Sequence, residues 1–411
     1  MSLQGPIIVV SDTKQPAVTA ALDAASMFPL IETDWTDAPR AVTQLNPALV
    51  VTAMPEGTEP DLDGLANQVS AIEPYLPIVA IDPKRPLPPK VIPFSQVRTD
   101  YSRLAPRLRA ALRVRTLHST VLRRSPDHAA SRRAIPQIDP LRDATALLVG
   151  RAGAYPALSV ALGERVGVVG ALSIEAAAKH LNTRDIDGIV LAEGFSDRVV
   201  DAFLTVLSED PRFRNLPVVA TLAGLAPAYD LPNLEMIVGE PALVAANALP
   251  MLRQHAFEVS LSRTLRSLDA GGLLDPATGL LTPAAFDRDL STSICQTLAN
   301  GGGLSVARFA FDPTHERARI DGARLLSRLM RQMDFGAAQD DGSVIVVFVE
   351  TDLRTAHSIA RRLSSVMRHT SYGKRETQRN EPVVTFATLQ ASDTAQSLLA
   401  RLDEEGRRAA S

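Results

Sequence analysis

Two similar stretches of the chain indicate its architecture: NPALVVTAMPEG at residues 46–57 and DIDGIVLAEGFSD at residues 185–197. Each contains a short, β-branched apolar run bounded by turn residues, which is typical of a buried parallel strand. A second matching pair follows them, LPIVAIDP at residues 76–83 and LPVVATLA at residues 216–223. The members of each pair lie roughly 140 residues apart, and such a period predicts one fold used twice.

Helical stretches alternate with these strands, and this alternation predicts βαβ units in a doubly wound parallel sheet. In the first copy we expect strands at Ile7–Val10, Leu49–Thr52 and Pro77–Ile81, and helices at Pro16–Ser26, Leu62–Ile72 and Tyr101–Leu122. In the second copy we expect strands at Ala146–Val149, Gly188–Leu191, Pro217–Ala220 and Met236–Val238, and helices at Ser173–Leu181, Val199–Leu207 and Pro241–Ser267.

The rest of the chain has a mixed α/β pattern with a hairpin. The turn signal Gln339-Asp340-Asp341-Gly342 separates two apolar runs. We expect strands at Leu304–Phe311, Phe335–Ala338, Ser343–Phe348 and Val383–Thr388, and helices at Ile320–Met330, Leu353–Arg368 and Ala395–Arg408.

These patterns predict an α/β protein of three domains. Residues 1–125 and 144–262 form two doubly wound domains, and residues 263–411 form the third. Residues 126–143 are rich in Pro, Arg and Ser and have no core pattern, so we interpret them as a solvated linker.

Composition excludes several classes of protein. The chain has 411 residues and a net charge of −3, from 43 basic and 46 acidic side chains, which argues against a nucleic-acid partner. The single cysteine, Cys295, excludes a disulfide framework, and the seven histidines have no metal-ligand spacing. The first residues do not form a signal peptide, and no apolar run approaches the ~20 residues of a membrane span. We therefore expect a soluble cytoplasmic protein without a cofactor or bound metal.

The third domain resembles the diguanylate cyclase (GGDEF) family. Its motifs are LLDPATGLLTPAAF at 273–286, a strand ending near Asp312, the hairpin, VIVVFVETDLRTAHSIARRL at 344–363 and LLARLDEEGRRAA at 398–410. The two preceding domains resemble response-regulator receiver domains of the CheY/flavodoxin-like fold. Together they resemble the receiver–receiver–GGDEF arrangement of PleD-type cyclases, which implies a nucleotidyl cyclase-like fold for residues 263–411.

The residues that a receiver needs for phosphorylation are missing. A phosphoacceptor Asp requires an acidic pair that binds Mg²⁺, and a Lys-Pro follows the fifth strand; in the second domain Glu240-Pro241 takes the place of Lys-Pro. A shifted alignment would bring in Glu56 or Glu193, but neither has a cation-binding pair beside it. We therefore expect no phosphorylation, and pseudo-receivers that serve dimerisation or docking, with a homodimer as the assembly. The acidic pair and acceptor fall on Ser11, Asp12 and Ala53 in the first domain and on Gly150, Arg151 and Ala192 in the second.

The cyclase motif is also degenerate. The five positions that the family fills with Gly-Gly-Asp/Glu-Glu-Phe read DDGSV at residues 340–344. The resemblance further places the other metal carboxylate on Ala310 and the phosphate-contacting Lys on Ala410. Carboxylates in place of the glycines would repel a triphosphate and block its approach to the backbone. We therefore expect no catalytic residue, no metal site and no cyclase activity.

One regulatory feature of the family is retained. The family's inhibitory Arg-x-x-Asp site, which binds cyclic di-GMP, matches Arg331 and Asp334, with five residues between Asp334 and Asp340. A guanidinium can bind the guanine edge or a phosphate, while a carboxylate accepts from the guanine N1 and N2 hydrogens. The resemblance assigns a second contact to Arg362. The alternative interpretation is an exposed ion pair that contributes less than ~1 kcal/mol.

The leading hypothesis is a catalytically inactive effector or adaptor that binds cyclic di-GMP and recruits protein partners. The pattern is similar to that of a degenerate alphaproteobacterial paralogue of the PleD-type cyclases. This resemblance implies recruitment to a cell pole and delivery of a cell-cycle regulator to the ClpXP protease. The alternatives are a structural scaffold with a vestigial site, a GTP-binding pseudo-enzyme and a residual cyclase. The receiver-like arginines that could complete the ligand site are Arg212, Arg214 and Arg253.

Overall fold

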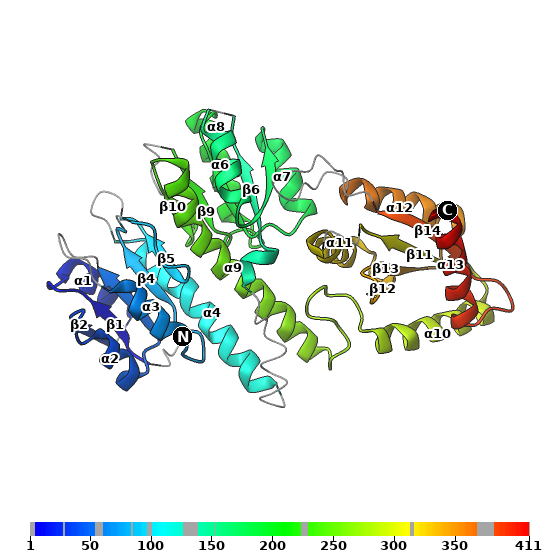
Figure 1. The fold of residues 1–411 in the computed structure, drawn as a ribbon, viewed down its shortest axis with the longest axis horizontal. Helices are drawn as coiled ribbons and strands as arrows, with labels where there is room; N and C mark the ends of the chain where they lie inside the picture. Colours follow the sequence, from blue (N-terminus) through cyan, green and yellow to red (C-terminus); the bar gives the residue numbers. More distant parts are fainter. Residues whose placement is uncertain are drawn as a thin grey trace. The chain divides into compact units, whose positions relative to one another are not determined.

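The computed structural model describes residues 5–27, 29–53, 61–83, 85–96, 101–125, 139–151, 153–222, 229–312, 316–367 and 382–410. Its contacts divide the chain into two compact units. Unit 1 comprises residues 1–180 and 186–261, and unit 2 comprises residues 181–185 and 262–411. Figure 1 colours both units along the sequence and labels the elements for which there is room.

Some sequence-based predictions lie outside the described residues. They concern Glu56, residues 126–138 of the predicted linker, the start of the segment that follows Asp312, and the side chain of Ala410. The predicted domain bounds at residues 125, 143 and 262 stay predictions.

Unit 1 contains two parallel five-stranded sheets with the same strand order. The first is ordered β2-β1-β3-β4-β5 and the second β7-β6-β8-β9-β10, which is the 2-1-3-4-5 order of flavodoxin-like folds. The repeat predicted from the paired sequence stretches is therefore present as a repeated topology. The strands of the first sheet are β1 (Ile7–Val10), β2 (Leu30–Thr33), β3 (Leu49–Ala53), β4 (Ile78–Ile81) and β5 (Val91–Phe94). Those of the second are β6 (Thr145–Val149), β7 (Gly167–Ala171), β8 (Gly188–Leu191), β9 (Val218–Ala220) and β10 (Leu234–Met236).

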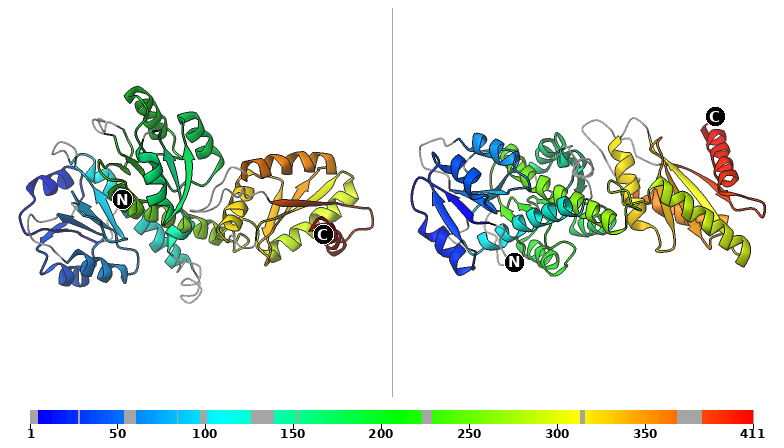
Figure 2. Two further views of the ribbon diagram at one scale, coloured as in Figure 1. Left: turned by 45° about the horizontal axis from the view of Figure 1, so that its top comes forward. Right: turned by 90° about the horizontal axis from the view of Figure 1, so that it is seen from below.

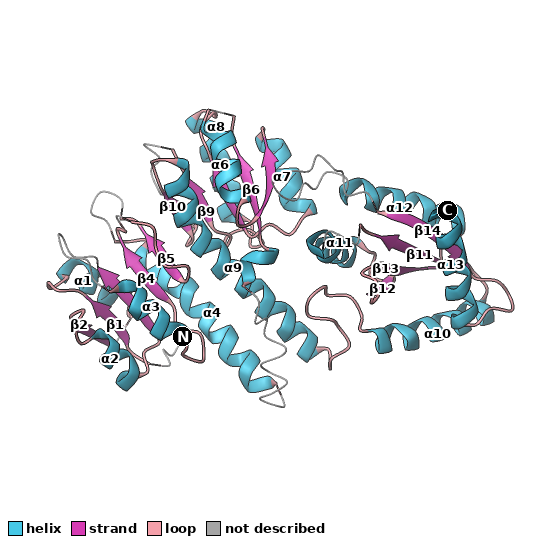
Figure 3. Ribbon diagram, viewed as in Figure 1, coloured by secondary structure: helices cyan, strands magenta, loops and turns pink. Residues whose placement is uncertain are grey.

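Helices connect the strands, as the alternating pattern predicts (Figure 3). The first sheet has α1 (Pro16–Ala24), α2 (Ala38–Leu45), α3 (Leu62–Ser70) and α4 (Leu104–Arg124). The second has a short 3₁₀ turn, η1 (Pro140–Asp143), then α6 (Ala154–Gly163), α7 (Ile174–Thr183), α8 (Asp197–Glu209) and α9 (Pro241–Asp269).

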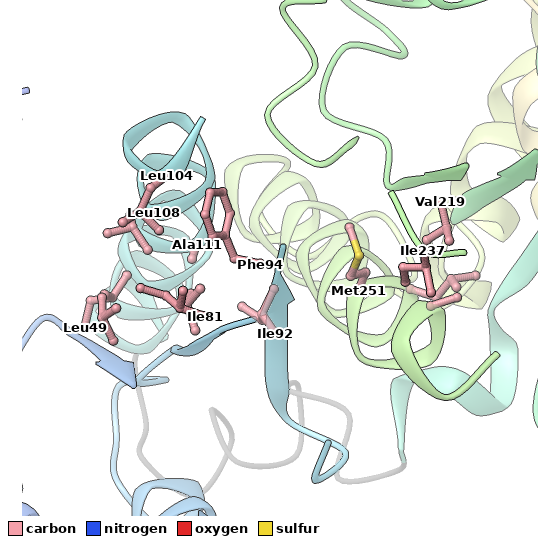
Figure 4. Close-up of a cluster of buried hydrophobic side chains, with 14 of the residues drawn as sticks. Leu49, Ile81, Ile92, Phe94, Leu104, Leu108, Ala111, Val219, Ile237 and Met251 are labelled. Atoms are coloured by element: carbon pink, nitrogen blue, oxygen red, sulfur yellow. The ribbon is translucent and has the colours of Figure 1, made fainter. Parts of the chain in front are cut away.

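One hydrophobic core joins the two sheets of unit 1. Buried residues of both sheets and of α4 and α9 belong to a single cluster, which includes Phe94, Leu108, Val219 and Met251 (Figure 4). The helices α4 and α9 run side by side within it (Figures 1 and 2). The two repeats are therefore packed against each other through apolar surface, the dominant favourable contribution to folding.

The last strand of the second sheet differs from its prediction. The sequence predicts Met236–Val238, but β10 begins at Leu234 and ends at Met236. Leu234 is fully buried, whereas Val238 is 64% exposed. The charged residue Glu235 obscured the strand in the sequence, because its burial depends on a partner from α4, Arg107.

Unit 2 contains a four-stranded antiparallel sheet in the order β12-β13-β11-β14. Along β13, Val344, Val346 and Phe348 face one hydrophobic cluster with α11 and α12, while Ile345 and Val347 face another with α10 and α13. The helices are α10 (Pro283–Asn300), α11 (Glu316–Leu329), α12 (Leu353–Met367) and α13 (Ala395–Ala410). The strands are β11 (Leu304–Ala310), β12 (Phe335–Ala338), β13 (Val344–Val349) and β14 (Val383–Thr388).

Within the part of the chain that the structure describes, no helix has the length and apolar character needed to cross a membrane.

Candidate functional site

The segment DPATGLL is a hydrogen-bonded turn that anchors the centre of unit 2. The carboxylate of Asp275 accepts from the Thr278 hydroxyl at 2.5 Å and from its backbone N–H at 3.2 Å. Gly279 follows at φ +76°, a left-handed conformation that glycine adopts without strain. The sequence motif thus folds into the turn that its Asp, Thr and Gly favour.

This turn connects to both elements that border the Arg331–Asp334 segment. The backbone N–H of Leu281 donates to the carbonyl of Gly336 on β12 at 2.9 Å. The hydroxyl of Ser327 on α11 donates to the carbonyl of Gly279 at 3.0 Å. The end of α11 and the start of β12 are therefore fixed on either side of residues 331–334.

Arg331 and Asp334 lie on the short connection between α11 and β12. The backbone N–H of Asp334 donates to the carbonyl of Arg331 at 3.0 Å, which closes a turn. Arg331 is exposed, whereas Asp334 is only 7% exposed. The turn thus presents a guanidinium to solvent beside a carboxylate that is withdrawn from it.

The two oxygens of the Asp334 carboxylate differ. Oδ1 accepts from the N–H of Val349 at 3.3 Å, but Oδ2 is buried and has no hydrogen-bond partner among the described residues. Burial raises the pKa of this carboxyl, and the N–H of Val349 together with the backbone and the charge of Arg331 oppose the rise only in part. A buried acceptor without a donor is unfavourable, and a ligand donor would relieve it.

Arg362 lies on the neighbouring helix, α12. Its side chain is exposed, and the next residue, Leu363, is buried in the cluster that also receives Met330, the residue before Arg331. Among the described residues, no hydrogen bond or ion pair joins Arg362 to Arg331 or Asp334. The helix carrying Arg362 thus packs into the same core as the end of α11.

The DDGSV stretch at residues 340–344 begins in the β12–β13 hairpin turn, where the sequence predicts a turn. Gln339 and Ser343 pair across the turn at 2.8 Å, and the N–H of Gly342 donates to the carbonyl of Gln339 at 2.9 Å. Gly342 has φ +79°, and a Cβ built there would lie 2.5 Å from Cδ of Arg319. The position therefore requires glycine, and an α11 side chain lies directly against it.

Asp341 is held by the protein itself. Its Oδ1 accepts from the N–H and the hydroxyl of Ser343 at 2.8 and 2.7 Å, and its Oδ2 lies 3.7 Å from Nη1 of Arg308. Burial acts to raise the pKa of Asp341, but the Ser343 hydrogen bonds and the charges of Arg308 and Arg319 lower it below its usual range. Arg308 also forms an ion pair with Asp403 of α13 at 2.6 Å. Arginines from β11 and α11 thus surround a carboxylate at this turn.

The positions expected for receiver phosphorylation lie at the carboxyl ends of the unit 1 strands. Ala53 is the last residue of β3, and Ala192 follows β8 directly. A Cβ built on Gly150 would lie 2.8 Å from Cβ of Ala192, so the backbone after β6 packs against the position of the acceptor. A side chain at position 150 would therefore require the neighbouring residues to shift.

The receiver-like arginines considered as additional ligand contacts all have partners within unit 1. Arg253 forms a bidentate pair with Asp139 at 2.9 and 2.7 Å, Arg212 pairs with Asp210, and Arg214 pairs with Asp230. Over the described residues, no cluster of three or more His, Cys, Asp and Glu side chains could hold a metal ion.

The sequence predicts Arg331, Asp334 and Arg362 as site residues, and this stays a prediction; it did not indicate that Arg308 and Arg319 lie at the hairpin turn. Spacing to the hairpin pointed to Arg331 and Asp334, and the family resemblance pointed to Arg362. Arg308 and Arg319 lie on β11 and α11, far from residue 341 in sequence, and only the pairing of β11 with β13 brings Arg308 near Asp341. The one sequence feature that pointed to Arg308 was the presence of an arginine within a mostly apolar predicted strand.

No protein-family model matches the sequence, and no curated protein matches it either. Several solved GGDEF structures are similar to part of the chain. One is the coiled-coil and GGDEF domain of DgcB from Caulobacter crescentus in complex with c-di-GMP, at 15% identity and TM-score 0.31, covering 35% of this chain and 83% of that chain. Another is a sensory box/GGDEF family protein from Caulobacter crescentus CB15, at 23% identity and TM-score 0.28, covering 33% of this chain and 96% of that chain. A third is the FimX GGDEF domain from Pseudomonas aeruginosa, at 18% identity and TM-score 0.29, covering 33% and 94%.

Proposed function

We propose that this protein is a catalytically inactive effector that binds cyclic di-GMP at the Arg331–Asp334 turn. The observation that carries the proposal is the unpartnered, buried Oδ2 of Asp334 beside the exposed guanidinium of Arg331. A guanine base would supply N–H donors to this oxygen, and the guanidinium would bind the guanine edge or a phosphate of the same ligand. Arg362 on α12 would contribute a second cationic contact.

The proposed lack of cyclase activity rests on the hairpin. A cyclase needs free carboxylates for metal ions and a backbone that a nucleotide can approach closely. Here the carboxylate of Asp341 already accepts from Ser343 and faces Arg308, and the side chain of Arg319 covers Gly342. Metal binding would have to displace these cations and donors, so we propose that the turn is structural.

The two unit 1 sheets are proposed to be pseudo-receivers that mediate dimerisation or docking. The alanines at the expected acceptor positions, Ala53 and Ala192, support this role, because a methyl side chain cannot accept a phosphoryl group. The whole arrangement resembles PopA, an alphaproteobacterial paralogue of PleD. By this resemblance, the partners would be factors of polar recruitment and of ClpXP proteolysis of a cell-cycle regulator.

Calorimetric titration of cyclic di-GMP tests the proposal. Wild-type protein is expected to bind it and not GTP, and Arg331→Ala is expected to bind about 10- to 100-fold more weakly, because a charge-assisted contact contributes about 1.5–3 kcal/mol. Arg407→Ala, which removes another exposed arginine of unit 2, should bind like the wild type. No binding by the wild type would leave a scaffold with a vestigial ion pair.

A matched pair on α12 tests the second contact. Arg361 and Arg362 are adjacent and both exposed, so their substitution by Ala should perturb the helix equally. Only Arg362→Ala is expected to weaken cyclic di-GMP binding, by about 3- to 30-fold for a partly solvated charged contact. Equal affinities of the two variants would remove Arg362 from the site.

A further inference from the structure

Unit 1 contains a cavity of about 620 Å³ far along the chain from the cyclic di-GMP turn. It is lined by α3 and the loop after it, by β4, by the approach to β5, by α4, by η1 and by α9. Both sequence repeats therefore contribute to its wall. The volume lies within the range of roughly 300–1,000 Å³ that is typical of small-molecule sites.

The body of the cavity is apolar and aromatic. Val69, Ile72, Leu76 and Ile78 line it on the side of the first sheet, and Phe257 of α9 lines it on the other. The Phe257 ring meets the rings of Tyr75 and His118 edge to face, at centroid distances of 5.5 and 5.4 Å. These fixed rings form walls against which a flat apolar group could pack.

His118 supplies a directed donor within this apolar wall. Its Nδ1 accepts from the backbone N–H of Tyr75 at 2.8 Å, so the proton of the neutral ring must be on Nε2. The residue is only 7% exposed, and no described residue accepts from Nε2. Burial also lowers the pKa of His118, which keeps the ring neutral at pH 7. The cavity therefore contains a nearly buried N–H without an acceptor.

Among the charged side chains that line the cavity, the cations outnumber the carboxylates. Arg253 is neutralised by its bidentate pair with Asp139. Lys90 and Arg165 lie exposed at the rim, with Glu73 as the remaining carboxylate. The charge of Glu73 acts on His118, and Arg165 acts on Asp139. An anion that accepts from the Nε2–H of His118 would therefore meet Glu73 as well as the two rim cations.

We propose that this cavity is a binding site for a small aromatic anion. The ring system of the ligand would pack against Phe257 and the aliphatic side chains, and its anionic group would accept from His118 and lie near Arg165. Because the cavity walls come from both repeats, such a ligand would stabilise their packing. The site is independent of the Arg331–Asp334 turn, so the two proposals can fail separately.

The probe is anilinonaphthalene sulfonate (ANS), an aromatic anion whose fluorescence rises in apolar surroundings. Titration into the full-length protein is expected to give saturable binding to a single site. Ile72→Trp, which fills the cavity, should reduce the number of bound ANS molecules, and thermal unfolding would verify that this variant is folded. Arg165→Glu should weaken ANS binding by about fivefold, as expected for reversal of a rim charge.

The matched control is Arg40→Glu, the same charge reversal at an exposed position of α2 outside the cavity lining. It should bind ANS like the wild type. Neutral phenylnaphthylamine should bind more weakly than ANS and should not distinguish Arg165→Glu from Arg40→Glu. The proposal is overturned if ANS does not saturate a single site, if Ile72→Trp binds it unchanged, or if both charge reversals have equal effects.

Discussion

At Asp334 the folded protein keeps one carboxylate oxygen buried without a donor. The neighbouring oxygen has the N–H of Val349, and the charge of Arg331 offsets the burial only in part, so the pKa of the carboxyl is raised. A residue with a purely structural role would be expected to have both oxygens satisfied or exposed. The unfavourable environment of Asp334 is consistent with a position that is completed by a ligand.

The raised pKa gives a pH dependence with a defined sign. Only the carboxylate accepts guanine N–H donors at both oxygens, so cyclic di-GMP affinity should fall as the pH is lowered through the Asp334 pKa, which lies above the usual 3.8. Stability should change in the opposite direction, because the folded state binds this proton more tightly than the unfolded chain. The contribution of protonated Asp334 to the free energy of unfolding is fully present below pH 3.8. It is lost as the pH rises through the pKa of Asp334 in the folded state.

Calorimetry and urea unfolding between pH 7 and pH 4, on the wild type and on Asp334→Asn, measure both effects. The variant should bind weakly with little pH dependence, and its stability relative to the wild type should decrease as the pH falls. An affinity of Asp334→Asn equal to that of the wild type would contradict the role of the carboxylate.

At the scale of elements, side chains from β11, α11 and α13 meet at the β12–β13 hairpin. Asp341, Arg308 and Asp403 form a chain of charged contacts, and Gly342 accommodates Arg319. The turn is thereby fixed by its own unit. These contacts join the end of β12 and the start of β13 to β11, α11 and α13.

Gly342→Ala should destabilise unit 2 by about 1–2 kcal/mol, since φ +79° is unfavourable for alanine and the new methyl group would displace Arg319. The matched control is Gly406→Ala in α13, where only Oγ1 of Thr385 lies near a built Cβ, at 3.9 Å. This change should stabilise by up to about 1 kcal/mol, because alanine favours a helix interior. Urea unfolding followed by circular dichroism measures both, and equal effects of the two substitutions would contradict the described turn.

At the scale of the whole molecule, the structure describes unit 1 as one body built from two repeats. The two repeats share a buried ion pair as well as an apolar core. The guanidinium of Arg107 on α4 pairs with Glu235 of β10 at 2.9 Å and donates a hydrogen bond to the carbonyl of Pro93 on β5. Both ionic side chains are 1% exposed. Charges so deeply buried are tolerated only when paired, so they specify how the two repeats fit together.

Glu235→Ala, a substitution in the second sheet, should therefore also destabilise the first sheet. Removal of one partner leaves Arg107 buried and uncompensated, at a cost of about 3–5 kcal/mol. The single tryptophan, Trp35, packs against the core of the first sheet, so its fluorescence reports on that sheet during urea unfolding. Its transition midpoint should fall in Glu235→Ala and remain unchanged in Asp210→Ala, which breaks an exposed pair with Arg212. An unchanged midpoint in Glu235→Ala would show that the repeats unfold separately.

Most of the fold could be predicted because its signals are local. The apolar runs of β1 and β8 coincide with their predicted bounds, and the hairpin turn lies at Gln339–Gly342 as expected. Edge strands were harder to predict from the sequence. The edge strand β2 is only partly buried, so its sequence lacks the continuous apolar run of a central strand. The strand β10 was displaced in the prediction because a buried Glu interrupts it.

The sequence by itself determined the repeat, the α/β class and the spacing that brings Arg331 and Asp334 to the turn before the hairpin. These depend on residue type and on distances of a few positions along the chain. Only the tertiary structure decided that Oδ2 of Asp334 is buried without a donor, that Arg308 faces Asp341, and that His118 and Phe257 line one cavity. The physical reason is that burial and electrostatic environment depend on groups up to hundreds of residues apart, which only packing brings together.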